Sequence, residues 1–266
     1  MFSIKYEDYF DENFNSGYII ALVTSLLFFT NSIFLLSVLV PKSARDSNHQ
    51  EWKWRNIANS FIHSSITGCG ACVYFWHYPN MGEDLIFLHN NASHFLIAFS
   101  MGYFLYDFID MLINDFKPKT YTLFVHHVMV VMGFGIAMIT YRYEGYVLCS
   151  LFIEINSIFL HLRQLMLIQQ WGREGILYRI NNTFNLGTFV VFRFLVMGWL
   201  TRFLVQHRQD FSAIAFRIAA LALAVIMVLN IGLLLRILKS DFQQCHSHKG
   251  SSSDIKTQLV DRVKAR

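Results

Sequence analysis

Blocks of about twenty apolar residues, separated by short polar segments, recur along the whole 266-residue chain. An α-helix of that length crosses the hydrocarbon core of a bilayer, which is about 30 Å thick. Windowed hydropathy places seven such blocks, at 18–40, 57–77, 92–113, 120–141, 145–163, 183–201 and 212–236. We therefore predict an all-α polytopic membrane helix bundle with about seven transmembrane helices.

The composition excludes an ordinary soluble domain. Charged residues make up 15% of the chain, whereas about 25% is typical of soluble domains. The net charge of +4 does not indicate nucleic-acid binding, because the basic residues lie in short loops and in the tail and form no basic face. Cys69 and Cys72 lie in an apolar segment, which favours helix packing over zinc or redox chemistry. We predict no metal site.

The distribution of Lys and Arg indicates the orientation of the chain. Most of these residues lie in segments 42–56, 114–119 and 163–182 and after residue 235, which all fall on one side of the predicted bundle. Positively charged loops favour the cytosolic side, so we place the N-terminus outside the cytosol and the C-terminus inside it. The acidic segment before the first block favours a retained span over a cleaved signal peptide.

The chain is expected to have four parts. They are an extracytosolic segment at 1–17, a first transmembrane helix at 18–40, the main helical domain at 50–240 and a Ser-rich, disordered cytosolic tail at 241–266. Asn91 begins an Asn-x-Ser sequon on the predicted outer side, which makes it a glycosylation candidate.

Several ionisable side chains lie inside the predicted spans, where each costs about 2.5–3.5 kcal/mol near the bilayer centre. These residues are His63, Asp107, Asp110, His126, His127, Glu154, His161 and Arg193. Counting from the cytosolic ends of the spans places His63, Asp107, His126 and His127 in one layer, roughly 9 Å deep. We expect them to line a polar cavity in the cytosolic half of the bundle, with a Glu154–Arg193 pair near the midplane.

Two interpretations of these residues stay open. Such side chains often form hydrogen bonds between membrane helices and need have no further role. Alternatively, His126 or His127 acts as a general base or acyl acceptor, and Asp107 or Glu154 orients it. Neither interpretation requires a cofactor, although a lipid or an acyl-CoA would be the expected ligand of such a cavity.

Four segments, in order, resemble one family: EWKWRNIANSFIHSSITG, GYFLYDFIDM, HHVMVV and SLFIEINSIFLHLRQL. Together they resemble the TLC-domain family, named for its TRAM, Lag and CLN members, over roughly residues 50–240. Within it the chain is most similar to the calfacilitin-like, membrane-fluidity-regulating branch. The double histidine of ceramide synthases, which belong to this family, matches His126 and His127. Their pair of aspartates three residues apart is replaced by Glu154 and Ser157, which weakens an acyltransferase interpretation.

The resemblance implies a regulator of membrane phospholipid composition that limits incorporation of long-chain polyunsaturated acyl chains. It implies the plasma membrane as the location, with the endoplasmic reticulum as an alternative. Membrane lipids are the expected partners; protein partners are left open. We favour a non-enzymatic role over an acyl-CoA-dependent acyltransferase or a channel-regulating protein. A seven-helix receptor is disfavoured, because all three prolines lie in loops and the Arg-containing triplet that ends the third span of such receptors is missing.

Overall fold

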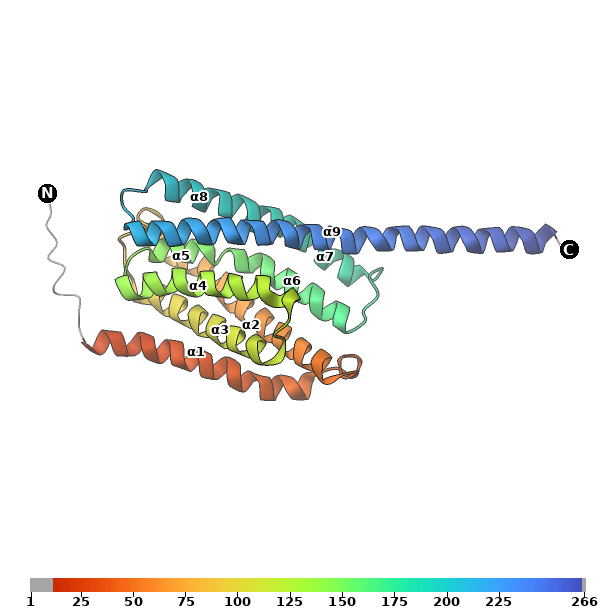
Figure 1. Ribbon diagram of the computed structural model, residues 1–266, viewed down its shortest axis with the longest axis horizontal. Coiled ribbons are helices and arrows are strands. Elements are labelled where there is room, and N and C mark those ends of the chain that lie inside the picture. Colours follow the sequence, from red (N-terminus) through yellow and green to blue (C-terminus); the bar gives the residue numbers. More distant parts are fainter. Residues whose placement is uncertain (1–11, 265–266) are drawn as a thin grey trace. The chain divides into compact units, whose positions relative to one another are not determined.

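The computed structural model describes residues 12–264, with side chains described for 18–118 and 120–241. All regular secondary structure in this part of the chain is helical, which confirms the all-α prediction for it (Figure 1). The helices are α1 (Glu12–Leu39), α2 (Asn48–His77), α3 (Asn91–Asn114), α4 (Tyr121–Thr140), α5 (Glu144–Ser150), α6 (Ile153–Ile168), α7 (Ile176–Thr188), α8 (Val196–Gln206) and α9 (Ala213–Lys264). A π-helical segment, Phe189–Leu195, joins α7 to α8.

The chain divides into two compact units, residues 1–224 and 225–266. The first unit holds α1 to α8 and the beginning of α9, and all sites discussed below belong to it. The second unit is the remainder of α9, whose helical backbone continues to Lys264. The tail that the sequence predicts as disordered therefore carries a helical backbone through most of its length, although its polar, Ser-rich composition offers little apolar surface to bury. Residues 1–11 of the predicted N-terminal segment lie outside the described residues.

Six segments of the described chain are long and apolar enough to cross a membrane. They are Tyr18–Leu39, Asn91–Asn114, Tyr121–Thr140, Glu144–Ile168, Ile176–Gln206 and Ala213–Asp241. They correspond to six of the seven predicted spans. The seventh, at 57–77, lies within α2, which has 30 residues but does not meet the same criterion of composition. Polar side chains lower the mean hydropathy of α2. The buried ones are Asn59, Ser60, His63, Ser64 and Thr67.

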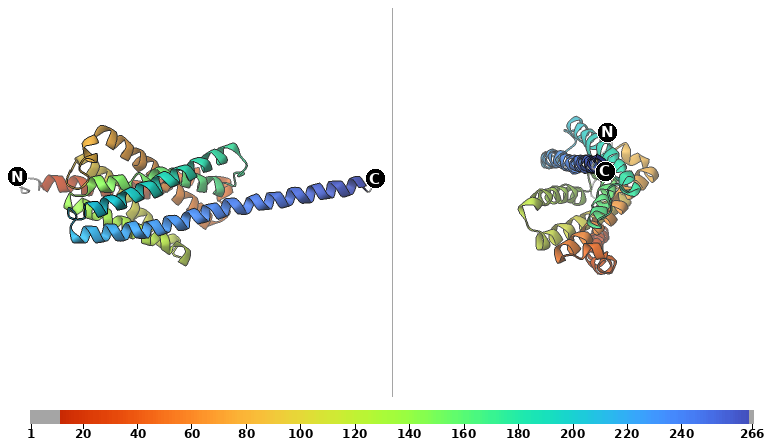
Figure 2. Two further views of the ribbon diagram at one scale, coloured as in Figure 1. Left: turned by 90° about the horizontal axis from the view of Figure 1, so that it is seen from above. Right: turned by 90° about the vertical axis from the view of Figure 1, so that its right-hand side faces the viewer.

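Two pairs of long helices make extensive contacts: α1, which lies at the edge of the first unit (Figure 2), packs along α3, and α2 packs along α6. Gly102 permits the first contact, since a Cβ atom there would lie 2.6 Å from the carbonyl oxygen of Leu22. Ser25 then donates a hydrogen bond across the gap to the carbonyl oxygen of Phe99, at 2.6 Å. Phe29 of α1 is fully buried in an aromatic core that includes Tyr103 of α3.

Local sequence explains where two of these helices begin. Ser47 has an extended backbone and accepts a hydrogen bond from the amide of Gln50, which caps α2. Asn90 caps α3 in the same way by accepting a bond from the amide of Ala92. The cap at Asn90 fixes the start of α3, and with it the position of the polar residues that follow.

Candidate functional site

A buried ion pair joins the predicted site residues Asp107 of α3 and His127 of α4. The His127 Nε2 atom lies 2.8 Å from Asp107 Oδ2, and the His127 Nδ1 atom lies 2.8 Å from the carbonyl oxygen of Leu123. Both ring nitrogens therefore face acceptors, so the pair needs one proton more than a neutral imidazole beside a carboxylate. The pair is either imidazolium and carboxylate or imidazole and carboxylic acid, and it holds an exchangeable proton between two helices.

His126 behaves differently from its neighbour. Its ring nitrogens have no hydrogen-bond partner among the residues that the structure describes, and its side chain is only half-buried. Its ring meets the rings of Phe104 and His127 edge to face. Because both nitrogens of His127 are engaged, His126 is the member of the double histidine whose nitrogens can meet a ligand.

The carboxylates of α3 are held by the start of α2. Asn56 donates one hydrogen bond to Asp107 Oδ1 at 2.6 Å and another to Asp110 Oδ2 at 3.1 Å. Trp52 donates its indole N–H to Asp110 Oδ2 at 2.9 Å. Trp52 and Asn56 are absent from the predicted site residues, although their spacing of four residues places them on one face of a helix.

His63 lies deep between helices and is fully buried. Its Nε2 atom is 3.0 Å from Ser100 Oγ, and its ring stacks on Tyr103 with the ring centres 3.9 Å apart. The Tyr103 hydroxyl in turn donates to Ser60 at 2.8 Å. This arrangement is that of a hydrogen bond between membrane helices, and it favours the structural interpretation for His63.

Glu154 and Arg193 have hydrogen-bond partners that the sequence did not predict. Glu154 Oε2 accepts a bond from Ser64 at 2.7 Å. Arg193, in the π-helical segment, donates to Asn156 Oδ1 at 2.5 Å and to Ser157 Oγ at 2.8 Å. Ser157, which replaces the second aspartate of the ceramide synthases, is thus a partner of this guanidinium. The direct Glu154–Arg193 pair stays a prediction.

The predicted polar residues form two groups. Asp107 and His127 join α3 to α4, and Arg193 joins the π-helical segment to Asn156 and Ser157 of α6. The side chains of His126, Glu154 and His161 keep partial exposure. A common polar cavity between the two groups stays a prediction. An open pocket of about 420 Å³ lies elsewhere, at the turn between α6 and α7, where Trp171 and Tyr178 line it.

Sequence comparison identifies the family. The TLC domain matches residues 53–239, which is more than half of the chain. The chain belongs to the TLC-domain family. The matched region begins inside α2, so α1 lies outside the TLC domain although it packs along α3. The family resemblance of the sequence is confirmed, and the protein is a membrane-associated member of a lipid-related family.

Curated relatives of the TLC-domain family cover most of this chain. TLC domain-containing protein 2 of Danio rerio is 42% identical over 210 residues, which are 79% of this chain and 84% of the relative. TLC domain-containing protein 2 of Homo sapiens is 32% identical, over 81% of this chain and 80% of the relative. TLC domain-containing protein 1 of Mus musculus is 30% identical, over 72% of this chain and 76% of the relative.

Proposed function

We propose that this TLC-domain protein regulates the composition and fluidity of membrane phospholipids. It limits the incorporation of long-chain polyunsaturated acyl chains into them. The observation that carries the proposal is the Asp107–His127 ion pair with the unbonded ring of His126 beside it. Ionisable side chains inside a membrane bundle mark a ligand or proton pathway more often than they mark packing.

In this proposal the polar residues recognise the head group or thioester of an acyl lipid, while the apolar helices accommodate the acyl chain. His126 contributes a hydrogen bond to the ligand, and the Asp107–His127 pair holds an exchangeable proton next to it. Asn56 and Trp52 hold the carboxylates in place from α2. The ligand would be a phospholipid or an acyl-CoA.

We also propose the arrangement in the membrane. The N-terminus lies outside the cytosol and the C-terminus lies inside it. α2 crosses the membrane together with the six apolar segments, which gives seven spans. Buried hydrogen bonds of Asn59 to α1 and α3 support this role of α2, because they satisfy its polar groups without water. The plasma membrane is the proposed location, with the endoplasmic reticulum as the alternative.

The test is the acyl composition of phospholipids in cells that lack the protein, after polyunsaturated fatty acid is added to the medium. Re-expression of the wild type should lower the polyunsaturated share of phospholipids. His126→Ala, expressed at the same level, should not lower it. His77→Ala is the matched control, because His77 is exposed at the end of α2. An unchanged composition after wild-type expression would refute the proposal.

One observation favours a second function, that of an acyl-CoA-dependent acyltransferase. His126 has free ring nitrogens beside a proton-holding ion pair, as a general base requires. The acceptor's hydroxyl or amine would give its proton to His126 and attack the thioester carbonyl. The carbon–sulfur bond would break, and the CoA thiolate would take the proton.

Purified protein with an acyl-CoA and a sphingoid or lysophospholipid acceptor separates the two functions. Turnover that disappears in His126→Ala, with unchanged folding, would establish the enzyme. Absence of turnover for every acceptor, together with the effect on phospholipid composition in cells, would leave the non-enzymatic role.

A further inference from the structure

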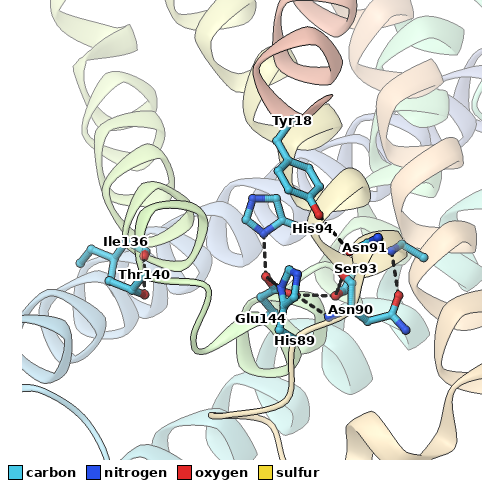
Figure 3. A network of polar contacts seen from close by, with 10 residues as sticks. Tyr18, His89, Asn90, Asn91, Ser93, His94, Ile136, Thr140 and Glu144 are labelled. Atoms are coloured by element: carbon cyan, nitrogen blue, oxygen red, sulfur yellow. Dashed lines mark hydrogen bonds and ion pairs between the residues drawn. The ribbon is translucent and has the colours of Figure 1, made fainter. Parts of the chain in front are cut away.

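Three ionisable side chains meet at the end of the bundle opposite to Asp110. His89 lies in the segment before α3, His94 lies in the first turn of α3, and Glu144 is the first residue of α5 (Figure 3). The Nδ1 atoms of His89 and His94 are each 2.6 Å from the same oxygen, Oε1 of Glu144. One ligand atom from each of the three residues lies within 4.8 Å of the other two. We call these three residues the His–Glu cluster.

The backbone around Glu144 is unusual. Tyr141 and Tyr143, on either side of the turn into α5, have positive φ angles of 53° and 67°. Non-glycine residues rarely adopt this conformation, and it tends to persist where a functional geometry requires it. Gly145 follows, and a Cβ atom there would lie 2.7 Å from Leu85 Cα. The turn thus brings the Glu144 carboxylate against the segment that carries His89.

The second carboxylate oxygen of Glu144 is fixed independently. Its Oε2 atom accepts a hydrogen bond from the hydroxyl of Ser93 at 2.5 Å and one from the amide of Asn90 at 3.4 Å. Oε1 is therefore left to face the two imidazoles. Carboxylates that bind metal ions are commonly held in place by hydrogen bonds of this kind.

The surroundings of the His–Glu cluster are aromatic. Tyr141 stacks on His94 with ring centres 4.9 Å apart, and Tyr18 of α1 approaches the same ring at 3.9 Å. Glu144 and His94 are buried, whereas the His89 side chain is 16% exposed. The cluster is thus largely enclosed, and His89 is its most exposed member.

We propose that His89, His94 and Glu144 bind a divalent transition-metal ion of the zinc type, which fastens the segment before α3 to the start of α5. Two imidazole nitrogens and one carboxylate oxygen are a common zinc ligand set, with the fourth position left to water. The sequence does not predict this site, because about fifty residues separate Glu144 from the two histidines. The proposal is independent of the proposed lipid function.

The geometry requires a modest adjustment to receive the ion. Zinc lies about 2.0–2.1 Å from its ligands, so neighbouring ligand atoms in a tetrahedral site are about 3.3 Å apart. The two nitrogen–oxygen distances of 2.6 Å therefore widen by about 0.7 Å on binding. Rotation of the His89 and Glu144 side chains provides this movement. Without the ion, each Nδ1 atom of His89 and His94 carries a proton and donates a hydrogen bond to Glu144 Oε1.

The test is zinc binding by the full chain, purified in detergent, stripped with a chelator and dialysed against zinc chloride. Elemental analysis should find about one zinc per chain in the wild type, and zinc should raise the temperature of thermal unfolding, because an ion that binds only the folded state stabilises it. Glu144→Gln and His89→Ala should abolish both effects. Ser93→Ala, which removes the bond to Oε2 and a bond to the Asn90 carbonyl oxygen but no proposed zinc ligand, should weaken zinc binding by about tenfold to hundredfold.

His77→Ala is the control, since it removes an exposed histidine at the end of α2 and should leave zinc binding unchanged. Wild-type protein that binds no zinc and gains no thermal stability would overturn the proposal. Equal binding by wild type and Glu144→Gln would overturn it as well. If the variants do not fold, the wild-type stoichiometry and the zinc-dependent unfolding temperature decide the question without them.

Discussion

Asp107 accepts hydrogen bonds on both carboxylate oxygens, from Asn56 and from His127. Replacing Asp107 by asparagine or by alanine therefore separates the effect of its hydrogen bonds on stability from the effect of its charge. An amide in its place can still accept from Asn56 and can donate to His127 Nε2, provided that His127 is neutral and donates through Nδ1 to Leu123. An alanine leaves His127 Nε2 without this partner and removes one of the two acceptors of the Asn56 amide, which keeps its bond to Asp110.

We predict that Asp107→Asn unfolds near the wild-type temperature, whereas Asp107→Ala is destabilised by about 1–3 kcal/mol, because the buried His127 Nε2 atom is left unpaired. Both should lose the proposed effect on phospholipid composition, because neither holds the exchangeable proton. Thermal unfolding of the proteins in lipid nanodiscs measures the first effect. Asp46→Asn, at an exposed carboxylate, is the control. A large loss of stability in Asp107→Asn would show that the carboxylate charge itself holds the bundle together.

Counting residues from the helix ends placed Asp107 and His127 at one depth, and the structure brings these two side chains into contact. The pairing of these two rather than Asp107 and His126 was not predictable, because it depends on how each helix is rotated about its axis. The roles of Asn56 and Trp52 were missed for the same reason. Their partners, Asp107 and Asp110, lie more than fifty residues along the chain.

Among the helices, the contact between α1 and α3 depends on a missing side chain at Gly102. The oxygen of Leu22 and the Ser25 side chain occupy the space that a Cβ atom would need. We predict that Gly102→Ala forces the two helices apart and lowers the stability of the protein by about 1–3 kcal/mol, as overpacking does in other cores.

Gly133→Ala in α4 is the matched control, because a Cβ atom there meets nothing within 4 Å. It should leave stability unchanged or raise it slightly, since alanine favours a helix more than glycine does. Equal unfolding temperatures for the two variants would mean that α1 and α3 do not pack as closely as described.

Hydropathy located the helices well but not the interruptions within them. The predicted span at 145–163 is two helices, α5 and α6, and the predicted span at 183–201 contains the π-helical segment between α7 and α8. Hydropathy does not register tertiary hydrogen bonds, and near the π-helical segment Asn156 donates to Asn185 and Thr188 and accepts from Arg193.

For the chain as a whole, the proposed orientation rests on its charged loops. We predict that an antibody reaches a tag at the N-terminus on intact cells. If the protein lies in the endoplasmic reticulum, the antibody should reach this tag only after the reticulum membrane is also permeabilised. A tag at the C-terminus should be reached only after the plasma membrane is permeabilised. Both tags on the same side would require an even number of spans, as the six apolar segments alone would give.

The central claim is that the polar residues around His126 receive an acyl lipid inside the TLC-domain bundle. Mass spectrometry of lipid that co-purifies with the intact chain tests it most directly. We predict that the wild type and His77→Ala carry a phospholipid or an acyl-CoA. His126→Ala should carry about tenfold less, as expected for the loss of one hydrogen bond to a charged group. An empty wild-type bundle, or equal lipid in all three proteins, would contradict the claim.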